Sequence, residues 1–245
     1  MEIDKFKSAH NKNTQVLYVR INELKIEASK DINDAVCRIG LSDGSLFSFR
    51  NCYLPPEIIE THLIIFSQNK QSLPDADKTA AEITAFEEAA FRHASACLRA
   101  EKNALRLIAR AEQCCGGLKR KLEKRGHDTA CINAVIERLC SLSLLDDSRF
   151  ARLWLESRLR ITRSPRQLLS SLCSRGIDRD DAQTALKNVL DDEAEYALLL
   201  RFVNKYKKKV RRKIIDESDV RRSIKYLLKS EGFSHTAIMR FLEEG

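Results

Sequence analysis

The side chains of this chain that are best suited to chemistry are clustered cations. The densest run, residues 205–213, holds seven Lys and Arg residues with one aromatic ring among them. Lys and Arg neutralise nucleic-acid phosphates, and an interleaved aromatic side chain could stack on a base. The alternative is a solvated helix end whose cations complement the helix dipole, and the sequence leaves both interpretations open. The candidate contacts of this run are Lys205, Tyr206, Lys207, Lys208, Lys209, Arg211, Arg212 and Lys213.

Two further basic groups lie in the second half of the chain. The first consists of Arg158, Arg160, Arg163 and Arg166. Arginine suits bidentate contact with carboxylate or phosphate, and this group is too dense for helix capping alone, so we favour a binding role. The second is a basic run in which a solvated helix face is the favoured interpretation. Its candidate contact residues are Lys119, Arg120 and Lys121.

No catalytic arrangement is evident. The five histidines are scattered, and the sequence contains no nucleophile elbow, phosphate-binding loop, zincin motif or dinucleotide-binding motif. Asp146 and Asp147 precede a predicted helix, where carboxylates cap the first turn and complement the dipole. We therefore interpret this pair as caps rather than metal ligands, and we predict that the protein is not an enzyme.

Eight cysteines invite a metal or disulfide interpretation, but their spacing does not support one. They include no Cys-x-x-Cys pair, and we expect no histidine at helical spacing that would complete a tetrahedral zinc site. Nothing around Cys114 and Cys115 matches a known reactive arrangement. We predict small buried apolar side chains, no metal and no cofactor.

The elements that must position the basic groups occur three times. In each unit a short amphipathic helix ends at a glycine, a capping residue follows, and a second amphipathic helix begins. The glycines are Gly126, Gly176 and Gly232, roughly fifty residues apart, a period typical of stacked helical repeats. Phe150 and Trp154 lie four residues apart, a spacing that favours core packing over a binding anchor. The predicted first helices of the units are residues 104–113, 148–160 and 193–208.

Specific motifs accompany these repeats. They are Ala104-Leu105 with Ile108; Leu118, Lys121-Leu122 and Arg125-Gly126; Leu144-Leu145-Asp146-Asp147; Phe150-Ala151 and Arg158; and Pro165-Arg166, Leu168, Leu172 and Arg175-Gly176-Ile177. At these positions the chain resembles the RecX family, bacterial regulators of the RecA recombinase. The resemblance extends from Ala104 to the C-terminus and implies the partner, the RecA filament.

The chain departs from the family pattern at a few positions. Cys114, followed by Cys115 and two glycines, stands where a capping serine is usual, which predicts a helix start weaker by roughly 1–2 kcal/mol. Ser171 stands where the family usually has a glutamate. Ser143 and Ser164 stand where glycine is common. These changes affect local stability more than family membership.

The first third of the chain has a different pattern. Apolar and polar residues alternate over residues 14–30, and the hairpin signal Ser42-Asp43-Gly44-Ser45 lies within residues 36–50. Together they predict a small antiparallel sheet of two to four strands over roughly residues 14–50. A short helix is expected to begin at Pro55-Pro56, and residues 79–113 show helical periodicity as one helix or two. The predicted domains are a β-rich segment at 1–67, a linker at 68–78, and repeats at 79–145, 146–190 and 191–245. The predicted fold is therefore mostly α, with three tandem three-helix repeats in an elongated array.

Charge is unevenly distributed along the chain. Of the formal net charge of +8, residues 1–80 contribute −1, from 10 Lys and Arg against 11 Asp and Glu, and residues 81–245 contribute +9, from 33 against 24. The basic repeats point to a polyanion or an acidic partner surface. The N-terminus has no apolar signal-peptide core and no apolar run approaches the length of a membrane span, so we expect a cytoplasmic protein without membrane association.

These observations together favour a regulator over an enzyme. We expect a monomer that binds the RecA filament, contacts single-stranded DNA through it, and modulates its recombinase and ATPase activities in DNA repair, recombination and the SOS response. Inhibition is the favoured direction, and the sequence leaves stimulation open. The alternative is a stand-alone basic DNA- or RNA-binding protein such as a helix-turn-helix repressor. Three copies of the unit in one chain argue against a dimeric operator reader.

Overall fold

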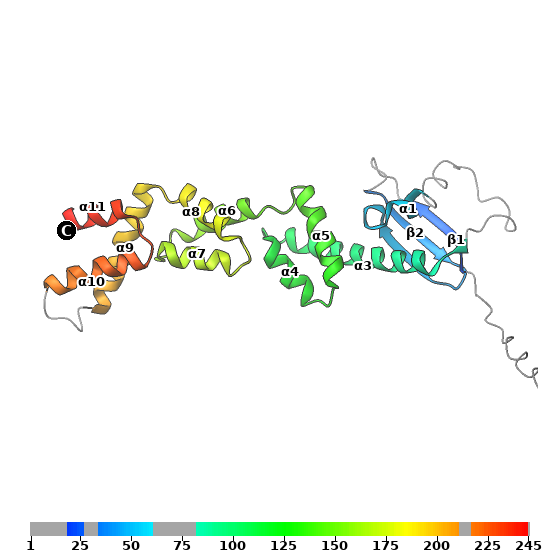
Figure 1. Ribbon diagram of the computed structural model, residues 1–245, viewed down its shortest axis with the longest axis horizontal. Coiled ribbons are helices and arrows are strands. Elements are labelled where there is room, and N and C mark those ends of the chain that lie inside the picture. Colours follow the sequence, from blue (N-terminus) through cyan, green and yellow to red (C-terminus); the bar gives the residue numbers. More distant parts are fainter. Residues whose placement is uncertain (1–18, 27–33, 61–81, 211–216, 245) are drawn as a thin grey trace, which may run out of the picture. The chain divides into compact units, whose positions relative to one another are not determined.

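The computed structural model describes residues 19–26, 34–60, 82–210 and 217–244. The chain divides into two compact units, Met1–Arg99 and Ala100–Gly245. The first unit contains a small sheet and the first turns of a long helix, and the second is built from helices (Figure 1).

The first unit is organised around an antiparallel sheet with the strand order β3-β2-β1-β4. Its strands are β1 (Val19–Ile26), β2 (Val36–Leu41), β3 (Leu46–Arg50) and β4 (Glu82–Ile83). The predicted hairpin connects β2 and β3: Asp43 Oδ1 accepts a hydrogen bond from the Ser45 amide at 2.8 Å, and Gly44 has a φ of 86°. Glycine takes this left-handed conformation without a side-chain penalty, so local sequence determines the turn.

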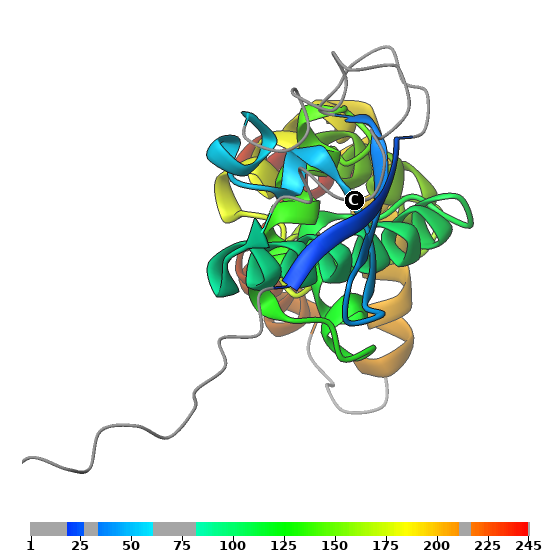
Figure 2. The same cartoon turned by 90° about the vertical axis from the view of Figure 1, so that its right-hand side faces the viewer.

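One face of the sheet supplies the core of the first unit. Cys37 and Ile39 of β2 and Phe49 of β3 are fully buried, in alternation with more exposed neighbours. Phe49 stacks on Phe91, with ring centroids 5.4 Å apart. Phe91 belongs to α3 (Ala85–Ile108), whose first turns lie along the sheet (Figures 1 and 2).

Two short helices follow β3. They are the 3-10 helix η2 (Asn51–Tyr53) and α1 (Pro56–Ile58). Helix α1 begins at the predicted proline pair, because the fixed φ of proline suits the first helical turn. The predicted linker at 68–78 lies outside the described residues.

The helix predicted within residues 79–113 is a single helix with a later start. Residues 82–83 form β4, and α3 begins only at Ala85. Thr84 Oγ1 accepts from the Glu87 amide at 3.2 Å, and the Glu87 carboxylate accepts from the Thr84 amide at 2.6 Å. This reciprocal capping box ends the strand and starts the helix, although the apolar periodicity continues through both.

The end of α3 also corrects the prediction. The first helix predicted over 104–113 is wrong beyond Ile108, where α3 ends. Gln113 is buried, and its Nε2 donates to the carbonyl oxygens of Ala111 at 2.9 Å and Leu107 at 3.5 Å. This side chain satisfies backbone acceptors that a continuing helix would have paired.

The three predicted three-helix repeats are present, and the mostly α fold class is confirmed (Figure 1). The first repeat ends with α4 and α5, after α3; the second holds α6, α7 and α8; and the third holds α9, α10 and α11. Their bounds are α4 (Cys115–Glu123), α5 (Thr129–Ser141), α6 (Asp147–Arg158), α7 (Pro165–Cys173), α8 (Arg179–Val189), α9 (Asp192–Val210), α10 (Glu217–Ser230) and α11 (His235–Glu244).

Glycine turns separate the last two helices of every repeat, as predicted. Gly126, Gly176 and Gly232 have φ values of 77°, 91° and 83°. A capping side chain then accepts a hydrogen bond from the first turn of the following helix, at 2.8–3.2 Å. These caps are Asp128, Asp178 and Ser234. The glycine turns and caps depend only on neighbouring residues, so they can be predicted from the sequence alone.

The second and third repeats share one hydrophobic core. Its fully buried leucines are Leu155, Leu168, Leu172, Leu198, Leu199 and Leu228. The fully buried residues of α4 and α5 are Leu118, Leu122, Ile132, Val135 and Leu139. Cys114, which precedes α4, packs in the core of the second and third repeats, so the first repeat docks there through the start of α4.

Replacing Gly176 by alanine should destabilise the protein more than replacing Gly126. Both glycines have positive φ, which costs a non-glycine residue about 1–2 kcal/mol. An added Cβ at Gly126 meets nothing within 4 Å, whereas at Gly176 it would lie 2.9 Å from the Cα of Gly116. We expect this overlap to add about 1–3 kcal/mol. Urea unfolding of the full chain measures both losses, and equal losses would contradict a tight contact at Gly176.

Candidate functional site

The start of α4 docks on the turn that follows α7, a contact that we name the first joint. An added Cβ at Gly116 would lie 2.8 Å from the Arg175 carbonyl oxygen and 2.9 Å from the Cα of Gly176, so this approach requires glycine. Cys114 Sγ donates to the same Arg175 oxygen at 3.4 Å. Gly116 therefore has a packing role.

The start of α7 docks on the turn that follows α10, which makes a second joint of the same kind. The Arg166 amide donates to the Glu231 carbonyl oxygen at 2.9 Å, and Arg166 Nη1 donates to the Ser230 carbonyl oxygen at 3.1 Å. Ser164 Oγ hydrogen-bonds to the Glu231 carboxylate. Equivalent elements thus connect the first repeat to the second and the second to the third.

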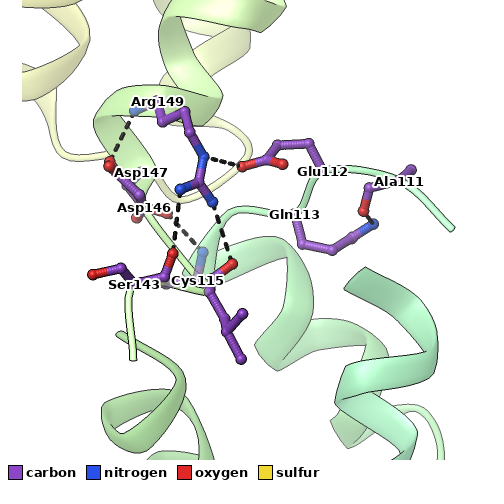
Figure 3. Close-up of polar contacts among 9 residues, drawn as sticks. Ala111, Glu112, Gln113, Cys115, Ser143, Asp146, Asp147 and Arg149 are labelled. Atoms are coloured by element: carbon purple, nitrogen blue, oxygen red, sulfur yellow. Dashed lines mark hydrogen bonds and ion pairs between the residues drawn. The ribbon is translucent and has the colours of Figure 1, made fainter. Parts of the chain in front are cut away.

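Asp146 and Asp147 act as caps, as predicted, but on two different helices (Figure 3). Asp146 Oδ1 accepts from the Arg149 amide at 2.8 Å and caps its own helix, α6. Asp147 Oδ1 accepts from the Cys115 amide at 2.7 Å, at the start of α4 in the preceding repeat. The Cys114 side chain makes no capping bond, so Asp147 offsets part of the weakness predicted for this helix start.

Arg149 connects the end of the first repeat to the second (Figure 3). Its Nε donates to Glu112 Oε1 at 2.8 Å, and its Nη atoms donate to the carbonyl oxygens of Ser143 and Leu144 at 3.2 and 3.3 Å. The hydrogen bond to Glu112 raises the pKa of the Arg149 guanidinium. Its charge and donors are already engaged, so Arg149 is a structural residue.

Four other arginines lie beside the first joint, in contact with Trp154, with Ser171 or with the Arg175 carbonyl oxygen. We name them the arginine cluster: Arg120, Arg158, Arg163 and Arg175. The guanidinium carbons of Arg175 and Arg158 lie 4.7 and 5.8 Å from the Trp154 ring centroid, within the range of cation–π attraction. Arg175 Nη1 donates to the Ser171 carbonyl oxygen at 2.7 Å, and Arg163 Nη1 donates to Ser171 Oγ at 3.3 Å. Arg120 Nη2 donates to the Arg175 carbonyl oxygen at 2.8 Å.

The cluster differs in its charge balance from the arginines that form ion pairs. Arg149, Arg152 and Arg240 each pair with a carboxylate at 2.7–3.4 Å. Among the residues that the structure describes, no carboxylate pairs with a member of the cluster, and the buried Nε of Arg158 has no hydrogen-bond partner. Positioned guanidinium groups without a neutralising partner suit bidentate binding of phosphate or carboxylate.

The structure separates the arginines that sequence reasoning grouped together. Arg158 and Arg163 belong to the arginine cluster. Arg160 is exposed, and Arg166 belongs to the second joint. Only part of the predicted group therefore forms one surface.

The basic run on α4 is also divided. Arg120 faces the first joint and joins the arginine cluster, although a solvated face was the favoured interpretation for this run. Lys121 Nζ donates to Gln113 Oε1 at 2.6 Å. Lys119 is half-buried. The binding interpretation of this run thus rests on Arg120.

The densest cationic run begins in the last turns of α9. Lys205 is exposed, whereas Tyr206 is half-buried and packs against the core of the second and third repeats, which leaves less of its ring for stacking. The predicted residues whose side chains lie outside the description are Lys207, Lys208, Lys209, Arg211, Arg212 and Lys213. The role of this run stays a prediction.

Sequence reasoning did not select Arg175 and Ser171 as site residues, and it assigned Trp154 to core packing. Trp154 does pack against the core, and its ring also makes cation–π contacts with the guanidinium groups of Arg158 and Arg175. One signal was available: Arg158 follows Trp154 by four residues on a predicted helix, which places them on one face. No neighbouring residue indicated Arg175, because its role depends on contacts between the turn after α7 and two other helices, α6 and α4.

The sequence also contains a histidine–cysteine pair that was not selected as a candidate. His93 and Cys97 do stand one helical turn apart on α3, with His93 Nε2 and Cys97 Sγ 3.5 Å apart. Two ligands do not complete a tetrahedral site, so this contact alone assigns no metal.

Comparison with known proteins identifies the family. Models of the RecX first and second three-helix domains match residues 90–139 and 146–186. The regulatory protein RecX of Treponema pallidum (strain Nichols) is 39% identical over 114 residues, which cover 46% of this chain and 70% of that protein. The chain belongs to the RecX family. The RecX protein of Mycobacterium leprae (strain Br4923) is 31% identical over 137 residues, 55% of this chain and 78% of the relative.

Solved RecX structures share the fold. A crystal structure of regulatory protein RecX aligns with a TM-score of 0.61 and 20% identity, covering 89% of this chain and 96% of the other. RecX from Lactobacillus salivarius aligns with a TM-score of 0.52 and 19% identity, covering 61% and 96%. Membership of this family gives the chain a regulatory role. Within the described part of the chain, every helix is too short or too polar to cross a bilayer.

Replacing Ser171 by glutamate should weaken polyanion binding. The new carboxylate would lie within reach of Arg163 and Arg175, which already donate to Ser171. Neutralising these guanidinium groups should lower the affinity for a single-stranded oligonucleotide roughly tenfold. The number of phosphate contacts derived from the slope of log affinity against log salt concentration should fall by about one to two. Fluorescence anisotropy at several salt concentrations measures both quantities. Ser148→Glu is the control, because it makes the same charge change in the first turn of α6, at the other end of that helix from Arg158. Equal losses in the two variants would argue against the arginine cluster.

Proposed function

We propose that this RecX-family protein binds the RecA–single-stranded-DNA filament and inhibits its recombinase and ATPase activities, in DNA repair, recombination and the SOS response. Family membership supports regulation rather than catalysis. The choice of the RecA filament as partner follows from the resemblance of the motifs from Ala104 onward to the RecX family. The proposed protein acts as a monomer in the cytoplasm, where the chromosome lies, and needs no cofactor.

The arginine cluster is the observation that carries this proposal. A RecA filament on single-stranded DNA offers phosphates from the nucleic acid and carboxylates from the protein. Arg158, Arg163 and Arg175 can contact either group without first breaking an ion pair within the described residues. The contact with Trp154 orients Arg175 and Arg158 before binding, which lowers the entropy lost when a ligand is bound.

The repeats suggest how modest contacts become effective. Each repeat contacts the next through a joint formed by the start of one helix and the turn of another. Several repeats in one chain can bind neighbouring RecA protomers at once, so that each further contact forms at high effective concentration. Binding one filament state better than another then shifts the filament away from the state that hydrolyses ATP and exchanges strands.

The alternative is a basic DNA- or RNA-binding protein without a RecA partner. The net charge of +9 over residues 81–245 is compatible with that role. Sequence-specific footprinting on duplex DNA in the absence of RecA would favour the alternative. Salt-sensitive binding without sequence preference would count against an operator reader.

The central prediction concerns DNA-stimulated ATP hydrolysis by RecA. Well below one copy per protomer, the protein should suppress hydrolysis, since one bound chain acts on several protomers. The double variant Arg158→Gln/Arg163→Gln should need roughly tenfold more protein for the same suppression. The matched control is Arg152→Gln/Arg240→Gln, which removes the same charge from arginines already paired with carboxylates.

Two outcomes would contradict this proposal in different ways. No suppression by a full equivalent of the unmodified protein, with oligonucleotide binding intact, would favour the alternative role. Equal loss of suppression in the two double variants would leave the filament as partner and exclude the arginine cluster as the contact.

A further inference from the structure

Two cysteines of the first repeat lie in contact. Cys115 begins α4, Cys140 lies in the last turn of α5, and their Sγ atoms are 3.5 Å apart. Cys140 is exposed and Cys115 is partly buried. The prediction that the cysteines are small buried apolar side chains is wrong for Cys140.

We propose that Cys115 and Cys140 are a reversible dithiol–disulfide pair that is oxidised by low-molecular-weight disulfides of the glutathione class. A disulfide bond is about 2.05 Å long, so the sulfurs must approach each other by roughly 1.5 Å. Cys140 is one residue from the end of α5, and the chain then turns through Ser143 with a φ of 55°. Helix ends fray more readily than helix centres, so the last turn of α5 can supply this movement.

The surroundings of the two thiols set the order of reaction. The exposed Cys140 sulfur attacks the small disulfide, forming a mixed disulfide and releasing one small thiolate. Burial raises the pKa of the Cys115 thiol, and its hydrogen bond with Cys140 and the charge of Asp147 raise it further. Cys115 therefore reacts second: it loses its proton to water, attacks the Cys140 sulfur and expels the second small thiolate.

The atoms and electrons of the exchange balance without another reactant. Two protein thiols are oxidised to one disulfide, and one small disulfide is reduced to two small thiols. A reducing thiol in excess reverses the reaction. Disulfides of this transient kind are the ones expected in a reducing compartment, where they serve redox sensing.

The cross-link would act on the first joint. The Cys115 amide donates to Asp147 at 2.7 Å, and the adjacent Gly116 lies against Gly176. The cross-link ties Cys115 to the last turn of α5, so the part of the approach that Cys115 makes disturbs both contacts between the first and second repeats, beside the arginine cluster. Oxidation should then weaken RecA suppression, a consequence that rests on the proposed function.

Peptide mapping tests the pair directly. The full chain is incubated under native conditions with oxidised glutathione, alkylated, digested and examined by mass spectrometry. We expect a peptide cross-linked between Cys115 and Cys140, lost on addition of dithiothreitol. Cys140→Ser should leave Cys115 unmodified, and Cys115→Ser should leave Cys140 as a mixed disulfide with glutathione. The control is Cys173→Ser, which removes another partly buried cysteine, and this variant should retain the cross-link.

Other patterns would overturn the inference. A chain that gives only the mixed disulfide at Cys140, or only disulfides between two chains, has no functional pair. In the RecA assay, suppressing ATP hydrolysis to the same extent should require a roughly tenfold higher concentration of cross-linked protein than of reduced protein. Unchanged suppression would overturn the link to the first joint. Failure of the reduced protein to suppress would contradict the proposed function instead, and the peptide map would still decide whether the pair exists.

Discussion

The backbone contact between Gly116 and Gly176 is the constraint on which the arrangement of the first two repeats depends. A Cβ on either residue would lie 2.8–2.9 Å from backbone atoms of the other segment, too close for any side chain. Two glycines are needed for different reasons: Gly176 ends a helix with a φ of 91°, and Gly116 lets α4 approach it. At Gly232 the equivalent contacts to Pro165 and Arg166 are looser, 3.5–3.8 Å. The first joint is therefore the tighter of the two.

The same contact positions the residues that could bind a partner. It places Arg120 of α4 against the Arg175 carbonyl oxygen, while the Arg175 side chain lies over Trp154 of α6. Ser171 is uncharged, so it gives the neighbouring guanidinium groups no carboxylate partner. Packing and function are thus linked: a change that opens the first joint would also separate the arginine cluster. Cys115 lies in this joint, so its oxidation would disturb the contacts that the joint makes.

The sequence predicted what neighbouring residues determine and missed what distant ones do. The glycine turns and the Asp128 and Asp178 caps depend on adjacent residues, and they were predicted. The cap that Asp147 gives Cys115 joins residues 32 positions apart, and the Arg120 contact with Arg175 joins residues 55 apart. Hydrophobic periodicity carries no information about such pairs. It also misplaced the start of α3, because a buried strand residue, Ile83, continued the apolar pattern.

Chemical footprinting of arginines tests most directly whether the arginine cluster contacts the filament. A dicarbonyl reagent modifies accessible guanidinium groups, and mass spectrometry measures the modification of each arginine with and without RecA filaments. Our account predicts that filaments, and not equal concentrations of RecA without DNA, reduce modification of Arg158 and Arg163 while Arg152 and Arg240 stay unchanged. Protection confined to other arginines, or uniform across all of them, would contradict it.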